Sequence, residues 1–272
     1  MFFSIQTTDS IQNKLLENDY LIFFLLLSDL RTIKSDYRSR NGLPFSSLCC
    51  TLMQRNTEMK RNNPFDIVYE DKDLIVVYKK SGMLSIATDD GDMHNLYHYV
   101  REYVNRKKQK IFIVHRLDKS TSGLMIFAKS MEVKRMLQSA FEDRTVIRKY
   151  EAVVKENVPL DFEKRVVQYL CFDHRSGKVF VTKDRRKGDE AITYVKAKNP
   201  VKMGTALDIC IKTGRQNQIR IALHSLGLTL IGDKKYALDD SDRMMLNAYE
   251  LIFPETLRMR QHHFTLAPFW LE

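Results

Sequence analysis

Short runs of β-branched and aromatic residues recur from residue 65 onward, and they constrain the fold more than any other feature of the chain. The runs at 67–69 and 74–78 flank a polar turn, which predicts a hairpin. We expect further strands at 111–114, 124–128, 150–154, 178–181, 191–194 and 206–211, and helices at 96–107, 131–141 and 218–226. Because strands and helices do not alternate regularly, the sequence predicts an α+β fold, a mixed and mostly antiparallel sheet with flanking helices.

The first 62 residues have a different character. A helix is expected near residues 15–30, and the polar, turn-rich stretch after it sustains no period. We therefore expect two parts, an N-terminal extension over residues 1–62 and a regular domain over residues 63–272.

The charge balance points to a polyanionic partner. The chain carries 44 Lys+Arg against 34 Asp+Glu, a formal net charge of +10. Many basic proteins bind no nucleic acid, so charge alone leaves the partner open. The longest apolar run, residues 21–27, is too short to cross a bilayer, and no secretory signal precedes it, so we expect no membrane partner and a cytoplasmic protein. The four cysteines form no C-x-x-C pair, which predicts reduced thiols and no metal site.

A polar loop is predicted between two of the strands, with Asp118 as its single acid. His115, Arg116 and Lys119 would keep that carboxylate ionised, and Thr121 would donate a hydrogen bond to it. Functional residues gather on loops held by a rigid scaffold. A turn in which Asp118 only caps neighbouring amides is the structural alternative.

A second polar stretch, residues 212–220, leads into the last predicted helix. Gly214 suits a tight turn there, and the helix N-terminus favours an anion. Arg215 and Arg220 carry planar guanidinium groups that suit a carboxylate or a phosphate. The alternative is that both arginines are solvated surface groups.

Together the two stretches resemble the RluA-type family of RNA pseudouridine synthases. The family pattern H-R-L-D-x-x-T-S-G-L is complete at residues 115–124, and a K-x-x-G turn precedes it at 79–82. The K-x-Y segment corresponds to residues 148–154, the G-R-x-x-Q-I-R element to 214–220 and the G-D-x-x-Y element to 232–236. Five elements in the family's order make the resemblance specific.

The resemblance implies an isomerase with the pseudouridine synthase catalytic fold over residues 63–272. A uridine in RNA would be detached from its ribose at N1, turned and rejoined through C5, without a metal or cofactor. Several chemical routes stay open: attack at the sugar, attack at the uracil, and elimination to a glycal. Many relatives begin with an alpha-L-type RNA-binding module, which residues 1–62 match only faintly, so we expect a truncated module.

The resemblance also assigns roles to single residues. Asp118 matches the catalytic aspartate, Tyr150 the tyrosine that packs on the target base, and Arg220 the arginine that pairs with the aspartate. Arg116 matches the residue that fills the gap left by the flipped base. Asn217 departs from the pattern, because many members have His there. Other RNA contacts are expected from His115, Lys119, Thr121, Arg215 and Gln218.

Contacts beyond the pocket are expected from the basic cluster of Arg106, Lys107 and Lys108, although a solvated charge run is the alternative. Ribosomal RNA is favoured as substrate over transfer RNA, and a monomer is expected. Two other functions stay open. One is a non-catalytic RNA-binding factor in ribosome assembly on the same fold, and the other is an aspartate-dependent nucleosidase acting on free nucleotides.

Overall fold

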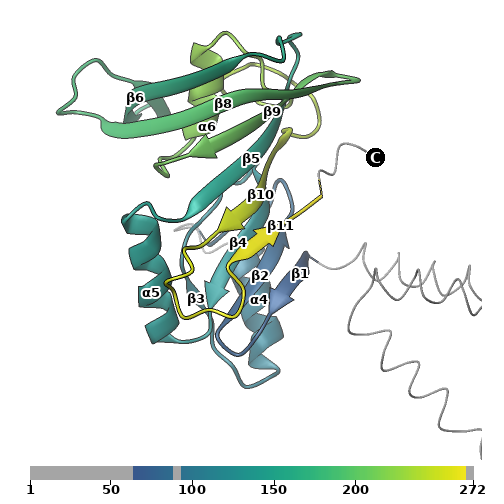
Figure 1. Cartoon of the computed structure of the whole chain (residues 1–272), viewed down its shortest axis with the longest axis vertical. Helices are drawn as coiled ribbons and strands as arrows, with labels where there is room; N and C mark the ends of the chain where they lie inside the picture. The colour runs from purple at the N-terminus through teal and green to yellow at the C-terminus, as the bar shows by residue number, and fades with distance from the viewer. Residues whose placement is uncertain (1–63, 88–92, 268–272) are drawn as a thin grey trace, which may run out of the picture. The chain divides into compact units, whose positions relative to one another are not determined.

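The computed structural model describes residues 64–87 and 93–267, so the predicted N-terminal extension lies outside the described residues. The described residues belong to one compact unit, Pro64–Glu272. One sheet dominates this unit, in the strand order β1-β2-β4-β10-β5-β9-β8-β6-β7, with β3 pairing β4 and β11 pairing β10 (Figure 1). The strands are β1 (Phe65–Glu70), β2 (Leu74–Lys79), β3 (Phe112–Ile113), β4 (Ser122–Ala128), β5 (Ile147–Val154), β6 (Glu163–Asp173), β7 (Lys178–Val181), β8 (Asp189–Val201), β9 (Gly204–Ile211), β10 (Leu246–Ile252) and β11 (His263–Thr265).

Three helices flank the sheet: α4 (Leu96–Asn105), α5 (Met131–Glu142) and α6 (Gln218–Ser225). Side-chain caps start two of them, because the side chains of Asn95 and Ser130 accept backbone N–H groups of the first turns of α4 and α5. Figure 1 shows α6 beside β8 in the upper part of the unit, and α4 and α5 in the lower part.

The central strands are buried on both faces, which explains their nearly continuous apolar sequence. Along β4, Leu124 and Ile126 belong to the core under α5, while Met125 and Phe127 belong to the core under α4 and α6. The same alternation holds along β2. Each face of the sheet therefore has its own hydrophobic core.

The predicted α+β class is confirmed: every strand pair is antiparallel except β4 with β10. The predicted hairpin, the three helices and the six further strands all occur, with ends shifted by a few residues. The sequence analysis missed three strands, β6, β10 and β11.

Strand β10 sets the position of the functional segments. Ala248 pairs with Gly123 on β4 in parallel and with Tyr150 on β5 in antiparallel register. A Cβ atom on Gly123 would lie 2.3 Å from the Ala248 carbonyl oxygen, so only glycine permits this approach. The loop before β4 and the middle of β5 are thereby held one strand apart.

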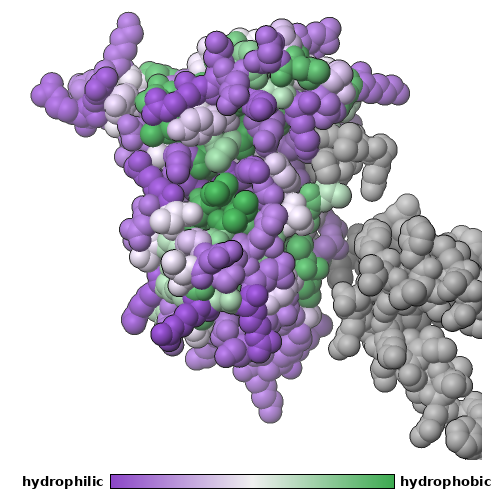
Figure 2. All heavy atoms as spheres, in the orientation of Figure 1, coloured by the Kyte–Doolittle hydropathy of each residue, from purple (hydrophilic) through white to green (hydrophobic). Residues whose placement is uncertain are grey.

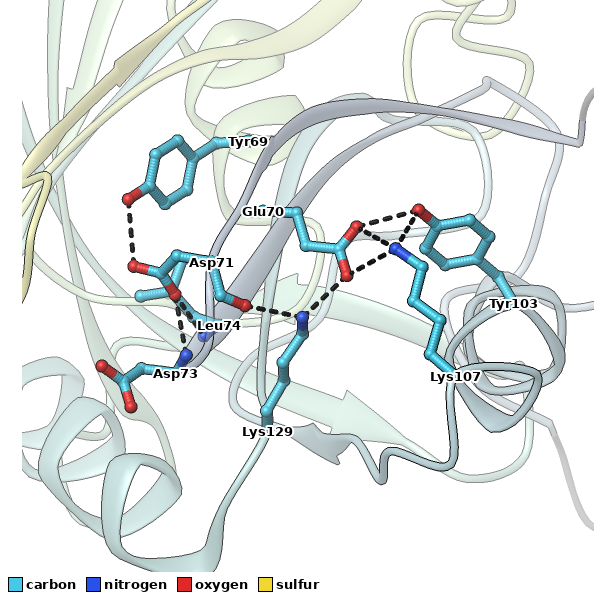
Figure 3. Close-up of polar contacts among 8 residues, drawn as sticks. All are labelled: Tyr69, Glu70, Asp71, Asp73, Leu74, Tyr103, Lys107 and Lys129. Atoms are coloured by element: carbon cyan, nitrogen blue, oxygen red, sulfur yellow. Dashed lines mark hydrogen bonds and ion pairs between the residues drawn. The ribbon is translucent and has the colours of Figure 1, made fainter. Parts of the chain in front are cut away.

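A polar network fastens the β1–β2 hairpin to α4 and the end of β4 (Figure 3). Glu70 accepts hydrogen bonds from the Tyr103 hydroxyl at 2.9 Å, from Lys107 Nζ at 3.0 Å and from Lys129 Nζ at 2.7 Å. These three partners together lower the pKa of Glu70 although burial alone would raise it. Within the described ranges, no helix is long and apolar enough to cross a membrane.

Candidate active site

The loop that carries Asp118 is held through its backbone. Thr121 N–H donates to the Asp118 carbonyl oxygen at 3.1 Å, which closes a turn. The Ser81 hydroxyl donates to the Ser120 carbonyl at 2.6 Å, and the Ser85 hydroxyl donates to the Leu117 carbonyl at 2.6 Å. The segment after β2 thus holds the loop at two points, one before Asp118 in the sequence and one after it.

The side chain of Lys79 is hydrogen-bonded to the same loop. Its side chain is fully buried, and Nζ donates to the carbonyls of Met83 at 2.7 Å and Lys119 at 3.1 Å. Burial lowers the pKa of Lys79 to about 7, while the charge of Asp118 acts to raise it. The sequence analysis saw Lys79 only as part of a turn motif.

The carboxylate of Asp118 is held by the loop that leads into α6. Asn217 N–H donates to Asp118 Oδ2 at 3.2 Å. Asn217 adopts a left-handed backbone conformation, with φ of 55°, which turns its N–H toward the carboxylate instead of into the helix. The backbone at the start of α6 thereby fixes the position of the Asp118 carboxylate.

The expected ion pair between Arg220 and Asp118 is wrong. Arg220 Nε donates to Asp233 Oδ2 at 2.9 Å, Nη2 bonds the second oxygen of Asp233, and Nη1 donates to Asn217 Oδ1 at 2.9 Å. Asp233 follows the Gly232 turn, so the side chain of Arg220 joins the 214–220 motif to the 232–236 motif, while the backbone of Asn217 joins it to the Asp118 loop. Arg220 therefore reaches Asp118 only through Asn217.

Arg220 and Asp233 form a buried ion pair in which each charge is neutralised by the other. Arg220 is 8% exposed and Asp233 is 1% exposed. Burial alone would raise the pKa of Asp233, but the bond to Arg220 outweighs it and the pKa is lowered. Asn217 Nδ2 also donates to the Tyr236 hydroxyl at 3.2 Å, so both ends of its side-chain amide are fixed.

Eight of the predicted site residues surround one cavity of about 600 Å³. Asp118 and Tyr150 lie in its wall together with Arg220 and five of the predicted RNA contacts; those five are His115, Arg116, Thr121, Arg215 and Gln218. Tyr150 is 9% exposed, and burial raises the pKa of its hydroxyl to about 12. The phenol is therefore neutral at physiological pH.

Two of the expected RNA contacts instead hold the protein together. Gln218 Oε1 accepts from Thr213 Oγ1 and Arg215 N–H, and its Nε2 donates to the Ile192 carbonyl and Thr193 Oγ1. Its amide has no donor or acceptor left for RNA, which corrects that expectation.

His115 is corrected in a similar way. Its Nε2 accepts the Ile126 N–H at 3.2 Å, and its ring stacks on Phe141 with centroids 4.8 Å apart. Burial lowers the pKa of His115 to about 3. The imidazole is neutral and cannot act as the cation expected beside Asp118.

The exposed basic residues divide into free and paired groups. Arg116 and Lys119 are exposed, and Arg215 pairs with Asp189 at 3.5 Å at the cavity rim. Hydrophilic side chains cover most of the face in Figure 2, and hydrophobic ones form separate patches, one of them in the middle of the view near β5 and β10.

Three lysine and arginine residues at the end of α4 do not line the cavity. All three side chains are exposed, and Lys107 also forms an ion pair with Glu70 at 3.0 Å (Figure 3). A phosphate would have to compete with Glu70 for Lys107, whereas Arg106 and Lys108 form no ion pair among the described residues.

The structure adds residues to the site that sequence reasoning missed. Phe141 and Arg148 line the cavity, and Asp233 completes the Arg220 cluster. The signal for Arg148 was its place in the K-x-Y segment, two residues before Tyr150. In the part of the chain that the structure describes, no three His, Cys, Asp or Glu side chains gather as metal ligands.

Comparison with known proteins identifies the family. A model described as RNA pseudouridylate synthase matches residues 73–225, a stretch that contains the Asp118 loop, Tyr150 and α6. The chain belongs to the RNA pseudouridylate synthase family. Curated relatives with RluA-type names agree with this assignment, which confirms the resemblance found in the sequence.

Three relatives illustrate the match. The chain is 35% identical over 202 residues to ribosomal large subunit pseudouridine synthase D of Borreliella burgdorferi, covering 70% of this chain and 61% of that protein. It is 31% identical to ribosomal large subunit pseudouridine synthase C of Buchnera aphidicola, covering 83% of this chain and 77% of the relative. It is 30% identical to the dual-specificity RNA pseudouridine synthase RluA of Vibrio cholerae, covering 69% and 76%. The chain spans less than two thirds of the length of several of the curated relatives it matches, among them the D-type enzymes.

Solved structures share the fold. Human RNA pseudouridylate synthase domain containing 1 superposes with a TM-score of 0.63 at 22% identity, covering 76% of this chain and 85% of that one. Human RNA pseudouridylate synthase domain containing 4 gives a TM-score of 0.58 at 23% identity, covering 80% and 93%.

Proposed function

We propose that this protein converts uridines within RNA to pseudouridine, with Asp118 acting at the glycosidic bond. The observation that carries the proposal is the placement of the Asp118 carboxylate in a cavity that it shares with Tyr150. Family membership supports the same reaction class. A cavity of about 600 Å³ has room for a nucleotide that has left its stack.

The geometry suggests a division of labour. Asp118, held by the Asn217 N–H, would attack or stabilise the positive charge that develops at C1′. Tyr150 would pack against the base as a neutral phenol, because its raised pKa leaves little phenolate. Arg220 would act indirectly, by fixing the side chain of Asn217. Arg116, exposed at the rim, would fill the space the base vacates.

Ribosomal RNA is the proposed substrate, ahead of transfer RNA. Relatives named for the ribosomal large subunit support this choice, while the relative named as dual-specificity keeps transfer RNA as a second substrate class. The exposed lysine and arginine side chains around the cavity and at the end of α4 would contact phosphates of the RNA. We also propose that the protein is a monomer and that it acts in the cytoplasm.

The test is base-resolution mapping of pseudouridine in total RNA from cells that lack the protein. The RNA is incubated with wild-type protein or with Asp118→Asn, which keeps the shape of the side chain and removes its charge. We expect defined new sites with the wild type and none with the variant, while both bind RNA equally.

Two results would contradict the proposal. Tight RNA binding without new sites for either protein would favour a non-catalytic assembly factor. Release of uracil from free nucleotides by the wild type, without modification of RNA, would favour a nucleosidase.

A further inference from the structure

A second guanidinium, from the half-buried side chain of Arg148, lies in the wall of the cavity, and its surroundings differ from those of Arg220. Arg148 sits on β5 two residues before Tyr150, so both side chains project from the same face of the strand. Arg148 Nη2 donates to the Lys212 carbonyl at 3.2 Å, and Cζ lies 5.6 Å from the centroid of the Phe141 ring. Its Nε is buried and has no hydrogen-bond partner among the described residues.

No carboxylate neutralises Arg148. The carboxylates that line the cavity are Asp118 and Glu142, and among the described residues neither forms an ion pair with it. Burial lowers the pKa of Arg148, and the nearby charge of Arg144 lowers it further, yet a guanidinium stays protonated in proteins. Arg220, by contrast, is fully paired with Asp233. The cavity therefore holds a positive charge that, among the described residues, has a carbonyl and an aromatic ring as neighbours but no carboxylate as an ion-pair partner.

The neighbouring loop leaves room for this guanidinium. A Cβ atom on Gly214 would lie 2.7 Å from Arg148 Nη1. Gly214 does not have a left-handed backbone conformation. A side chain at this position would therefore be disfavoured by steric overlap with Arg148 and not by backbone strain. Any larger residue at 214 would push the charged group away from its present place.

The reaction proposed above generates the missing negative charge. When the N1–C1′ bond breaks, its electron pair stays with uracil, and the charge spreads over N1, O2 and O4, while Asp118 or loss of the C2′ proton compensates C1′. Attack at C6 of the uracil ring likewise places negative charge on C5 and O4. Rejoining forms the C5–C1′ bond, releases the C5 proton and returns a proton to N1. Uridine and pseudouridine themselves are neutral in the base, so the charge exists only between them.

Resting on the proposed function, we propose that Arg148 is a catalytic residue that binds the negative charge developing on the uracil ring. It lies beside Tyr150, the residue against which the base packs, and Asp118 meets the opposite charge on the sugar. A preorganised donor that pairs with charge present only in the transition state raises kcat more than it tightens substrate binding.

Steady-state kinetics of Arg148→Met test this assignment. Methionine keeps apolar contact with Phe141 and removes the charge. We expect kcat to fall about 100-fold, the usual effect of losing one such donor, with the KM for RNA changed less than about threefold. Arg165→Met is the matched control, because Arg165 is an exposed strand arginine outside the cavity, and we expect its kcat to be unchanged.

Two further measurements separate a catalytic role from a folding defect. Methylguanidinium added to Arg148→Ala should restore part of the lost rate and should not accelerate the wild type. Gly214→Ala keeps the charge but displaces Nη1, so we expect its kcat to fall with little change in thermal stability.

The outcomes are distinguishable. A raised KM with unchanged kcat in Arg148→Met would overturn the proposal and assign Arg148 to a backbone phosphate. Unchanged kinetics, or a rate loss that methylguanidinium does not rescue, would also overturn it while leaving the pseudouridine synthase function intact. An inactive wild type would overturn that function, and this inference with it.

Discussion

Asn217 connects three residues of the site. Its N–H bonds Asp118, its Oδ1 accepts from Arg220, and its Nδ2 donates to Tyr236. Asparagine is one of the few residues other than glycine that tolerates a left-handed backbone. The histidine expected there by resemblance is thus replaced by a residue that suits both the backbone and the two side-chain partners.

The Arg220–Asp233 pair should be costly to break. Asp233→Asn removes the negative partner and leaves a buried guanidinium uncompensated, so we expect the free energy of unfolding to fall by about 3–5 kcal/mol. Urea unfolding measures it. The control is Asp189→Asn, which removes the exposed partner of Arg215 and should cost less than about 1 kcal/mol. Equal losses would show that the burial of the pair contributes nothing.

His115 should make the protein sensitive to acid. Its folded pKa of about 3 lies below the value near 6.5 of an unfolded histidine, so the unfolded chain takes up the proton first. The stability conferred by the neutral ring is complete above pH 6.5 and is lost as the pH falls toward 3. Urea unfolding between pH 7.5 and 5 should show a decline steeper by about 1 kcal/mol per pH unit in the wild type than in His115→Gln. Parallel declines would contradict this assignment.

Sequence reasoning located the site residues but not their partners. Asp118, Tyr150 and Arg220 do line one cavity, as the motifs predicted. The partner of Arg220 could not be read, because Asp233 and Asp118 are both acids near glycine turns and only the folded chain shows which one is in reach. The sequence also gives no sign that the side-chain amide of Gln218 is fully hydrogen-bonded, whereas Nε of Arg148 has no partner among the described residues.

Among the elements, β4 and β10 depend on one glycine. Gly123 has a φ of +125°, and an added Cβ would meet the backbone of Ala248 at 2.3–2.7 Å. We expect Gly123→Ala to lower the free energy of unfolding by about 3 kcal/mol or more, because strain and steric overlap add. Gly177→Ala is the control, with φ of +63° and no atom within 4 Å, and should cost about 1 kcal/mol. Similar losses in both variants would show that backbone conformation alone matters.

Two of the missed strands lack the pattern that predicts a strand. β6 has only Leu170 fully buried, because it lies next to the edge of the sheet, and most of its residues are polar or partly exposed. β10 buries Asn247 in the centre of the sheet, and a bulge between Ala248 and Glu250 interrupts its alternation. Strands with apolar runs could be predicted from the sequence. Strands that form mainly through pairing with neighbouring strands could not.

For the whole molecule, the proposed binding of RNA should weaken with salt, because the net charge is +10, and the structure predicts which charges take part. Lys107→Gln and Lys108→Gln change the net charge equally at adjacent positions. Both side chains are exposed, but among the described residues only Lys107 forms an ion pair, with Glu70. We expect only Lys108→Gln to reduce the slope of log Kd against log salt, by up to about 0.7–0.9, as measured by RNA titration at several salt concentrations. An equal reduction would mean that overall charge, not a specific contact, sets the affinity.

The place of β10 also bears on how the protein is made. Strands β4 and β5 follow each other closely along the chain, yet each pairs with β10 and not with the other. A ribosome delivers residues 246–252 about a hundred residues after Tyr150 has emerged, so until then the two halves of the sheet have no common strand. The nascent chain therefore carries Asp118, Tyr150 and Arg148 before the strand that joins their two halves of the sheet has been made.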